Sequence, residues 1–288
     1  MSNTLTPRLI LETLLPQLKV AAGYARNLQP QIAALPAKEE GNNFFAAALT
    51  DADLAIQNLI EVALLGAFPQ IRFYGEEVEQ SRNTKYFRAI ALGSKDDYLV
   101  TLDPIDGTQF YLDGHSNYQI ILGILNLDDF EAVIALSPAL NTYYYAFRNQ
   151  GTFTGTLELG LDDCTLLQLT QPQPTILLGW GMSALSPLLG EQYKVVDVAT
   201  CYSREIQIPN LNGILSGELT GAVIRAGKFI DGAALAFLAR EAGCIVTTLD
   251  GSALPPLHAC KDYSLPGLIV ASSTSVHQHL LLAAQKSL

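Results

Sequence analysis

Two aspartates stand three residues apart in the stretch Asp103-Pro104-Ile105-Asp106-Gly107-Thr108, directly after the apolar run 98–102. The run predicts a buried strand, which Pro104 should end because proline has no N–H to give to a ladder. The two carboxylates would then lie on a tight turn and repel each other unless a cation lies between them. Their oxygens suit Mg²⁺. An ordinary Asx turn with glycine is the alternative interpretation of these residues by themselves.

Three more carboxylates stand at the predicted ends of helices and strands, where side chains can converge on one cleft. Glu76 follows a short predicted strand, and Asp53 and Asp231 stand at the starts of two predicted helices. Five carboxylates in one cleft would be unstable unless metal ions neutralised them. We therefore expect metal-assisted hydrolysis of a phosphate ester, in which bound ions activate the water and stabilise developing charge. For Asp53, a helix cap is the alternative interpretation.

The elements that must position these residues are predicted from apolar periodicity. Helices are expected over 5–25, from 51 until just before 69, over 231–242 and from 276, and Pro16 should kink or split the first. Strands are expected over 71–74, 98–102, 118–125, 131–137, 143–147, 151–153, 175–178, 194–198, 245–248 and 268–271. A helical pair followed by a meander predicts an α+β sandwich. The stretch 155–174, with its glycines and prolines, predicts a linker between an N-terminal half, 1–155, and a C-terminal half, 175–288.

The composition narrows the class of protein and of partner. The chain has 288 residues, of which 49% are hydrophobic and 16% charged, so it can bury a sizeable core. A net charge of −11 argues against nucleic-acid polymers and anionic membranes as partners. The cysteines have no zinc or CxxC spacing, and the N-terminus has no signal-peptide pattern, so we expect free thiols and a cytoplasmic protein. They are Cys164, Cys201, Cys244 and Cys260.

The stretch 103–108 resembles the signature of the inositol monophosphatase superfamily, which are Mg²⁺-dependent phosphomonoesterases. Two further pieces of the family pattern are present in the right order, Glu76-Glu77 upstream and Asp231-Gly232-Ala233-Ala234 downstream. The resemblance covers residues 38–280 or so. It implies a layered α-β-α-β-α sandwich, a homodimer, a small phosphorylated metabolite as substrate, and about two or three Mg²⁺ ions per site.

The resemblance also implies roles for individual residues. The metal ligands would be Glu76, Asp103, Asp106, Asp231 and the backbone carbonyl of Ile105. Thr108 and Asp53 resemble the couple that orients and deprotonates the attacking water, and Asp53, Thr108 and Glu76 would be the catalytic residues. The substrate would be bound by Gly107, Thr108, Arg225 and Asp231. Glu77 resembles a supporting group, and Lys38 resembles a lysine of a mobile loop.

Arg225 is a departure from the family pattern. It stands near the position where true inositol monophosphatases have a glutamate on the inositol ring, and it resembles the Arg-x-Gly of the 3′-phosphoadenosine phosphatase branch. A solvated loop arginine is the alternative. The substrate stays open between inositol phosphate, fructose-1,6-bisphosphate and 3′-phosphoadenosine 5′-phosphate. Two other classes also stay open: a catalytically weakened metabolite-binding or regulatory protein of the family type, and a glycoside hydrolase that uses two of the carboxylates.

Overall fold

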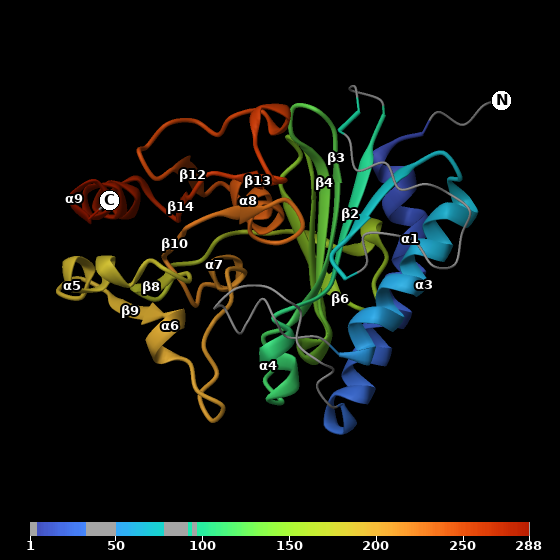
Figure 1. Cartoon of the computed structure of the whole chain (residues 1–288), viewed down its shortest axis with the longest axis horizontal. Helices are drawn as coiled ribbons and strands as arrows, with labels where there is room; N and C mark the ends of the chain where they lie inside the picture. Colours follow the sequence, from blue (N-terminus) through green and yellow to red (C-terminus); the bar gives the residue numbers. More distant parts are fainter. Residues whose placement is uncertain (1–4, 33–49, 78–91, 94–96, 288) are drawn as a thin grey trace. The chain divides into compact units, whose positions relative to one another are not determined.

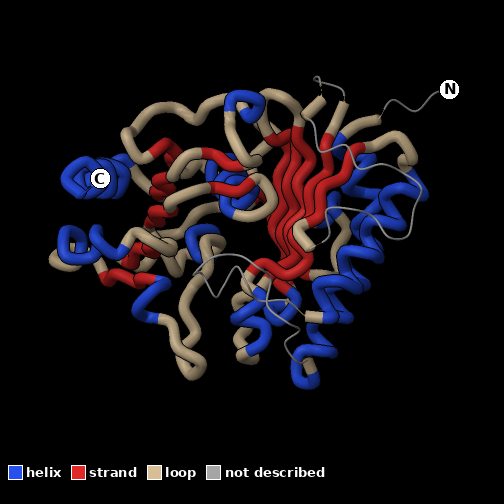
Figure 2. The backbone as a smooth tube through the Cα atoms, in the orientation of Figure 1, coloured by secondary structure: helices blue, strands red, loops and turns tan. Residues whose placement is uncertain are grey.

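The chain contains two compact units, each with its own sheet. The computed structural model describes residues 5–32, 50–77, 92–93 and 97–287. One unit comprises Met1–Phe147 with Thr154–Thr165, and the other comprises Arg148–Phe153 with Leu166–Leu288. The main sheets have seven and five strands (Figures 1 and 2).

The first unit is a helical layer on a seven-stranded sheet. Its elements are α1 (Pro7–Leu28), η1 (Gln29–Gln31), α3 (Asp51–Ala67), β1 (Arg72–Gly75), β2 (Leu99–Asp106), α4 (Thr108–Leu112), β3 (Gln119–Leu125), β4 (Phe130–Ser137), η2 (Pro138–Leu140), β5 (Thr142–Phe147), β6 (Thr152–Thr156), η3 (Leu161–Asp163) and β7 (Thr165–Leu166). The strands follow one another in chain order across the sheet. β1 is parallel to β2, whereas β2 to β5 form an antiparallel meander. Helices α1 and α3 pack together against this sheet (Figure 1).

The second unit has a five-stranded sheet in the order β12-β14-β10-β8-β9. Its elements are β8 (Thr175–Leu178), η4 (Ser183–Leu185), α5 (Ser186–Leu189), β9 (Lys194–Asp197), α6 (Val198–Cys201), α7 (Gly213–Ser216), β10 (Gly221–Ile224), β11 (Gly227–Lys228), α8 (Gly232–Glu241), β12 (Ile245–Thr248), η5 (Leu257–Ala259), β13 (Ser264–Leu265), β14 (Leu268–Ala271) and α9 (Thr274–Ser287). β8, β9 and β10 are parallel, and β14 is antiparallel to both β10 and β12.

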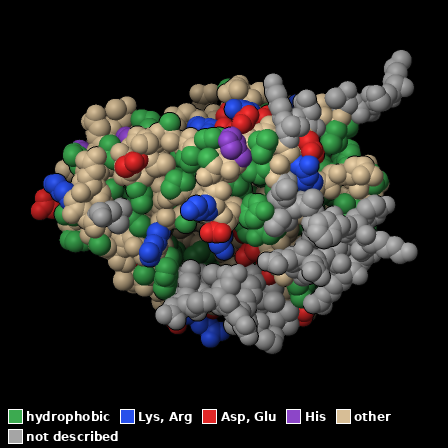
Figure 3. Space-filling view, turned by 45° about the horizontal axis from the view of Figure 1, so that its top comes forward, with side chains coloured by type: hydrophobic (Ala, Val, Ile, Leu, Met, Phe, Trp, Pro, Cys, Tyr) green, Lys and Arg blue, Asp and Glu red, His purple; other side chains and the backbone are tan. Residues whose placement is uncertain are grey.

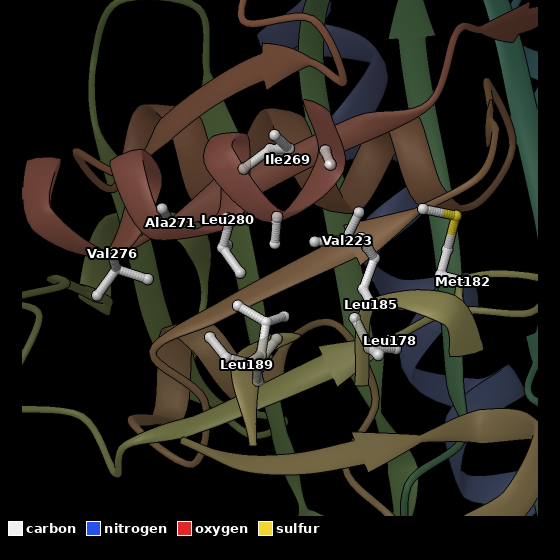
Figure 4. Packing of buried hydrophobic residues seen from close by; sticks show 12 residues of the cluster. Leu178, Met182, Leu185, Leu189, Val223, Ile269, Ala271, Val276 and Leu280 are labelled. Atoms are coloured by element: carbon white, nitrogen blue, oxygen red, sulfur yellow. The ribbon is translucent and has the colours of Figure 1, made fainter. Parts of the chain in front are cut away.

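Helices α8 and α9 cover opposite faces of the five-stranded sheet. Leu280 of α9 belongs to a buried apolar cluster with Val223 of β10 and Ile269 of β14 (Figure 4). Ile224, the next residue of β10, faces the other way, because successive side chains of a strand alternate. A Cβ added to Gly232, the first residue of α8, would lie 2.9 Å from Ile224 Cδ1. The even-numbered and odd-numbered positions of β10 therefore face different helices.

The first helix continues through its proline. α1 runs from Pro7 to Leu28, so Pro16 does not split the helix, which was one of the two expected outcomes. Pro16 lies on the exposed side of the helix, where water can hydrate the carbonyl that loses its hydrogen bond. The buried face of α1 keeps its apolar spacing across this position.

The predicted α+β fold is confirmed, and within the stretch predicted as a linker the first unit ends at Thr165 and the second continues from Leu166. Residues 155–174 include the end of β6, the turn η3 and the strand β7. Tyr143 and Tyr145 of β5 donate their hydroxyls to the carbonyls of Leu159 and Leu161, at 3.0 and 2.7 Å. The aromatic run of β5 therefore holds residues 159–161 against the first unit.

Two observations concern the surface. Within the described ranges, no helix is both long and apolar enough to cross a membrane. On the described part of the face shown in Figure 3, Lys and Arg side chains lie among Asp and Glu side chains.

The four cysteines are free thiols, as expected, and burial raises the pKa of Cys244 to about 12.

Candidate active site

The carboxyl ends of β1 and β2 meet at one edge of the seven-stranded sheet, because the two strands are parallel. Gly75 lies opposite Leu102 in their ladder. The Glu76 N–H donates to the Leu102 carbonyl at 3.1 Å, which extends the ladder by one residue. Glu76 therefore lies next to Asp103, the residue that follows Leu102 on β2.

Strand β2 does not end at Pro104, as the sequence suggests, but continues to Asp106. Asp103 lies opposite Ile121 of β3 and Asp106 lies opposite Gln119, so three steps on β2 match two on β3. This is a β-bulge, a place where a proline without an N–H is accommodated. Residues three apart on a regular strand face opposite sides, but the bulge brings Asp103 and Asp106 to the same face.

Asp106 is a crowded carboxylate. Burial raises its pKa to about 6, against the effect of a hydrogen bond from Gln119 and with the help of repulsion from Glu76. The Gln119 Nε2 donates to Asp106 Oδ2 at 2.7 Å. Asp103, on the same face, is only 3% exposed. Negative charge is therefore concentrated at this edge, and a cation would stabilise it.

The structure brings Thr108 and Asp53 together. Thr108 Oγ1 lies 3.3 Å from Asp53 Oδ1 and 2.9 Å from the Ile105 carbonyl oxygen. Asp53 is fully buried in the first turn of α3, and its Oδ2 accepts from the N–H and hydroxyl of Thr50, closing a capping box. Asp53 is thus the N3 residue of a capping box whose N-cap is Thr50, and it also contacts Thr108.

Gly107 begins the turn that presents Thr108. Its φ of +86° lies in the left-handed region, and an added Cβ would lie 2.9 Å from Phe110 Cδ2. The Gln29 side chain donates to the carbonyls of Tyr111 and His115, at 3.1 and 2.8 Å. These bonds tie the segment after Thr108 to the end of α1.

Two buried glutamines at this edge were missed by the sequence analysis. Gln57, one turn after Asp53 on α3, accepts the Glu77 N–H on its Oε1 at 2.9 Å. An added Cβ on Gly75 would lie 2.5 Å from Gln57 Cδ, so the glycine makes room for this amide. Gln119 is the second. For Gln119, the signal in the sequence is an amide at the start of an apolar strand.

Asp231 and Arg225 lie in the second unit, on different sides of its sheet. Asp231 is the N-cap of α8, and its carboxylate accepts the Gly232 N–H. Arg225 stands two residues after Val223, so it projects to the α9 face. A Cβ added to Gly181 would lie 3.2 Å from Arg225 Cδ.

Arg225 lines a cavity of about 570 Å³ on that face. The described lining residues are Gly181, Met182, Arg225, Leu249, Asp250, Ala284 and Gln285, and none of them is a predicted metal ligand. The substrate-binding role expected for Arg225 stays a prediction, and its position on the α9 face favours the alternative, a loop arginine. Lys38 lies outside the described residues.

Magnesium is the ion that the sequence implies. Across the described ranges, no group of three or more His, Cys, Asp and Glu side chains is arranged to hold a metal ion. Mg²⁺ needs fewer protein ligands, because it commonly takes one or two carboxylates together with waters and a substrate phosphate. The interacting pair Glu76 and Asp106, with the nearby Ile105 carbonyl, consists of such hard oxygens. The donor set therefore fits Mg²⁺ in chemical type.

Comparison with known proteins identifies the family. The model of the inositol monophosphatase family matches residues 17–288. The Nus factor SuhB of Pseudomonas aeruginosa is 25% identical over 255 residues, which is 83% of each chain. Among solved structures, the Thermotoga maritima IMPase TM1415 has a TM-score of 0.72 at 16% identity, over 96% of this chain and 97% of that one. An IMPase/NADP phosphatase complexed with Mg²⁺ and phosphate has a TM-score of 0.66 at 20% identity, over 96% and 95%. The chain belongs to the inositol monophosphatase family.

Proposed function

We propose that this protein hydrolyses the phosphate monoester of a small phosphorylated metabolite with the help of Mg²⁺. The observation that carries the proposal is the contact between the Thr108 hydroxyl and the buried Asp53 carboxylate. Thr108 stands two residues after Asp106, a proposed metal ligand. A hydroxyl that is hydrogen-bonded to a carboxylate, next to oxygen ligands for a metal ion, can orient a water molecule and accept its proton.

Five residues are proposed to hold the ions. They are Glu76, Asp103, Asp106, Asp231 and, through its carbonyl, Ile105. Bound Mg²⁺ would supply Lewis-acid activation of water and would stabilise charge on the phosphate oxygens. Asp231 is also proposed to contact the substrate.

Thr108 and Asp53 are proposed to move the proton. The attacking water gives a proton to Thr108 Oγ1 while the Thr108 hydroxyl proton passes to Asp53 Oδ1, so the pair ends with one proton more. The hydroxyl can turn from the Ile105 carbonyl to Asp53 without movement of heavy atoms, since both oxygens lie within 3.3 Å. The backbone N–H groups of Gly107 and Thr108 are proposed to bind the phosphate.

A regulatory role is the second candidate. It is favoured by the similarity to a protein named Nus factor SuhB. In that case the same carboxylates would bind a metabolite with little turnover. The homodimer and the cytoplasmic location expected from the sequence stay predictions in either case.

The test is phosphate release from inositol-1-phosphate, fructose-1,6-bisphosphate and 3′-phosphoadenosine 5′-phosphate, with Mg²⁺ and with EDTA. We expect release from at least one ester in Mg²⁺ and none in EDTA. Equilibrium dialysis with the same esters separates the candidates. Binding without release would favour the regulatory role, and release that persists in EDTA would contradict the metal site.

A further inference from the structure

Gln119 is an unusual residue for its position. It begins β3, whose other residues are all apolar, and it is fully buried. A buried amide is costly unless its polar atoms are hydrogen-bonded. Packing alone would therefore favour an apolar side chain here, and the amide needs another explanation.

The β-bulge in β2 gives Gln119 a charged neighbour. Gln119 lies directly opposite Asp106 in the ladder, so the two side chains share a face of the sheet. Its Nε2 lies 2.7 Å from Asp106 Oδ2, within the range of a charge-assisted hydrogen bond. The amide therefore fixes the plane of the carboxylate and occupies a lone pair of Oδ2.

We propose that Gln119 is a positioning residue that holds Asp106 in the orientation in which Oδ1 binds Mg²⁺. The proposal rests on the proposed function, which makes Asp106 a metal ligand. Groups that hydrogen-bond a ligating side chain orient it and tune its affinity, and their loss typically weakens metal binding by about 10- to 100-fold. Gln119 acts on the ion only through Asp106.

The experiment is calorimetric titration of Mg²⁺ into the metal-free full-length protein. Gln119→Met keeps the length of the side chain and removes the N–H donor. We expect its Mg²⁺ affinity to fall by about 10- to 100-fold. The matched control is Thr101→Val, an isosteric change at another buried polar position of the same sheet, 1% exposed, which should keep the wild-type affinity.

The measurement separates positioning from a purely structural role. A structural role would lower the unfolding midpoint of Gln119→Met and leave the Mg²⁺ affinity of the folded protein unchanged, and that result would overturn the proposal. If Gln119→Met does not fold, Gln119→Asn makes the same test, because it keeps the amide but withdraws it by one methylene. Wild-type affinity in the folded Asn variant would also overturn the proposal.

The wild-type titration distinguishes a failure of this proposal from a failure of the proposed function on which it rests. If the wild type binds no Mg²⁺, the proposed function fails. If the wild type binds Mg²⁺ and the Gln119 variants bind it equally well, the site stands and only the positioning role of Gln119 fails.

Discussion

The polar side chains at the carboxyl edges of the two sheets differ in burial. In the seven-stranded sheet, Asp103 at the end of β2 is 3% exposed, and Gln119, opposite Asp106, is fully buried. In the five-stranded sheet, Arg225 after β10 and Asp250 after β12 are exposed. Buried polar groups must find partners inside the protein, whereas exposed ones are satisfied by water. The polar groups at the first edge are therefore held in place by contacts within the protein, whereas Arg225 and Asp250 are hydrated.

The carboxylates of the two edges also differ in their electrostatics. Burial raises the pKa of Asp106 to about 6. Hydrogen bonds from Thr248 and Ser252 instead lower the pKa of Asp250. The negative charge of Asp106 is therefore unfavourable and would be stabilised by a cation, whereas the charge of Asp250 is already stabilised by hydrogen bonds.

The largest effect is expected at the proposed metal ligands. Asp103→Asn and Asp231→Asn should each lower Mg²⁺-dependent phosphate release by about a thousandfold or more, or about 4 kcal/mol, because each removes a proposed metal ligand. The measurement is kcat/KM at saturating Mg²⁺. Asp250→Asn, the matched change at the other edge, should keep wild-type activity. Near-normal turnover of Asp103→Asn would rule out the metal site.

The second prediction concerns stability without metal. The pKa of Asp106 is raised above its unfolded value, so its contribution to stability is full below pH 3.8 and is lost as the pH rises to about 6. A difference of about two in pKa corresponds to at most about 3 kcal/mol. Urea unfolding in EDTA between pH 4 and 7 should show this fall in the wild type and not in Asp106→Asn. Parallel pH profiles would contradict the prediction.

Thr108→Ala should lower kcat by about a hundredfold and leave KM nearly unchanged, because the hydroxyl acts on the water mainly in the transition state. Steady-state kinetics on the best substrate provide the measurement. Thr108→Ser keeps the hydroxyl and should retain most of the activity. A raised KM with unchanged kcat would make Thr108 a phosphate-binding residue.

Gly75→Ala should destabilise the protein by about 1–3 kcal/mol, because the new methyl group would overlap the buried Gln57 amide. The same change at Gly23 of α1 meets no atom within 4 Å and should stabilise the helix by about 0.5–1 kcal/mol. Urea unfolding compares the two variants. Equal stability would mean that Gln57 can move aside at little cost.

The smallest effect is expected at the second edge. Arg225→Ala should change kcat/KM by less than about twofold for inositol-1-phosphate, fructose-1,6-bisphosphate and 3′-phosphoadenosine 5′-phosphate, because the side chain faces α9. A selective loss on the bisphosphates would show that Arg225 reaches the substrate, and it would restore the original interpretation of this residue.

Local signals in the sequence were sufficient for much of the fold and for part of the site. The α+β class, the helix that Thr50 caps and the strand that carries Asp103 could all be predicted, because caps and apolar runs act over a few residues. The family itself was recognisable from three short motifs in order.

What the sequence could not predict depends on pairing between strands. The end of β2 was misplaced because a bulge, which depends on the partner strand, accommodates Pro104. The face on which Arg225 lies could not be predicted, because β10 was not predicted and its side-chain alternation was unknown. Gln119 was missed because its relation to Asp106 exists only across the ladder.

Because of the bulge in β2, the geometry of the site depends on the number of residues between Asp103 and Asp106. Asp103 and Asp106 share a face only because there is one extra residue between the positions opposite Ile121 and Gln119. Removing one of the two residues between them would leave the aspartates two apart on a regular pleat, where they still share a face, but it would remove the bulge and the extra twist that the bulge gives the strand. Substitutions of Ile105 should keep the bulge, since they leave the number of residues and the backbone carbonyl in place. Relatives that conserve the chemistry should therefore keep the spacing of the two aspartates.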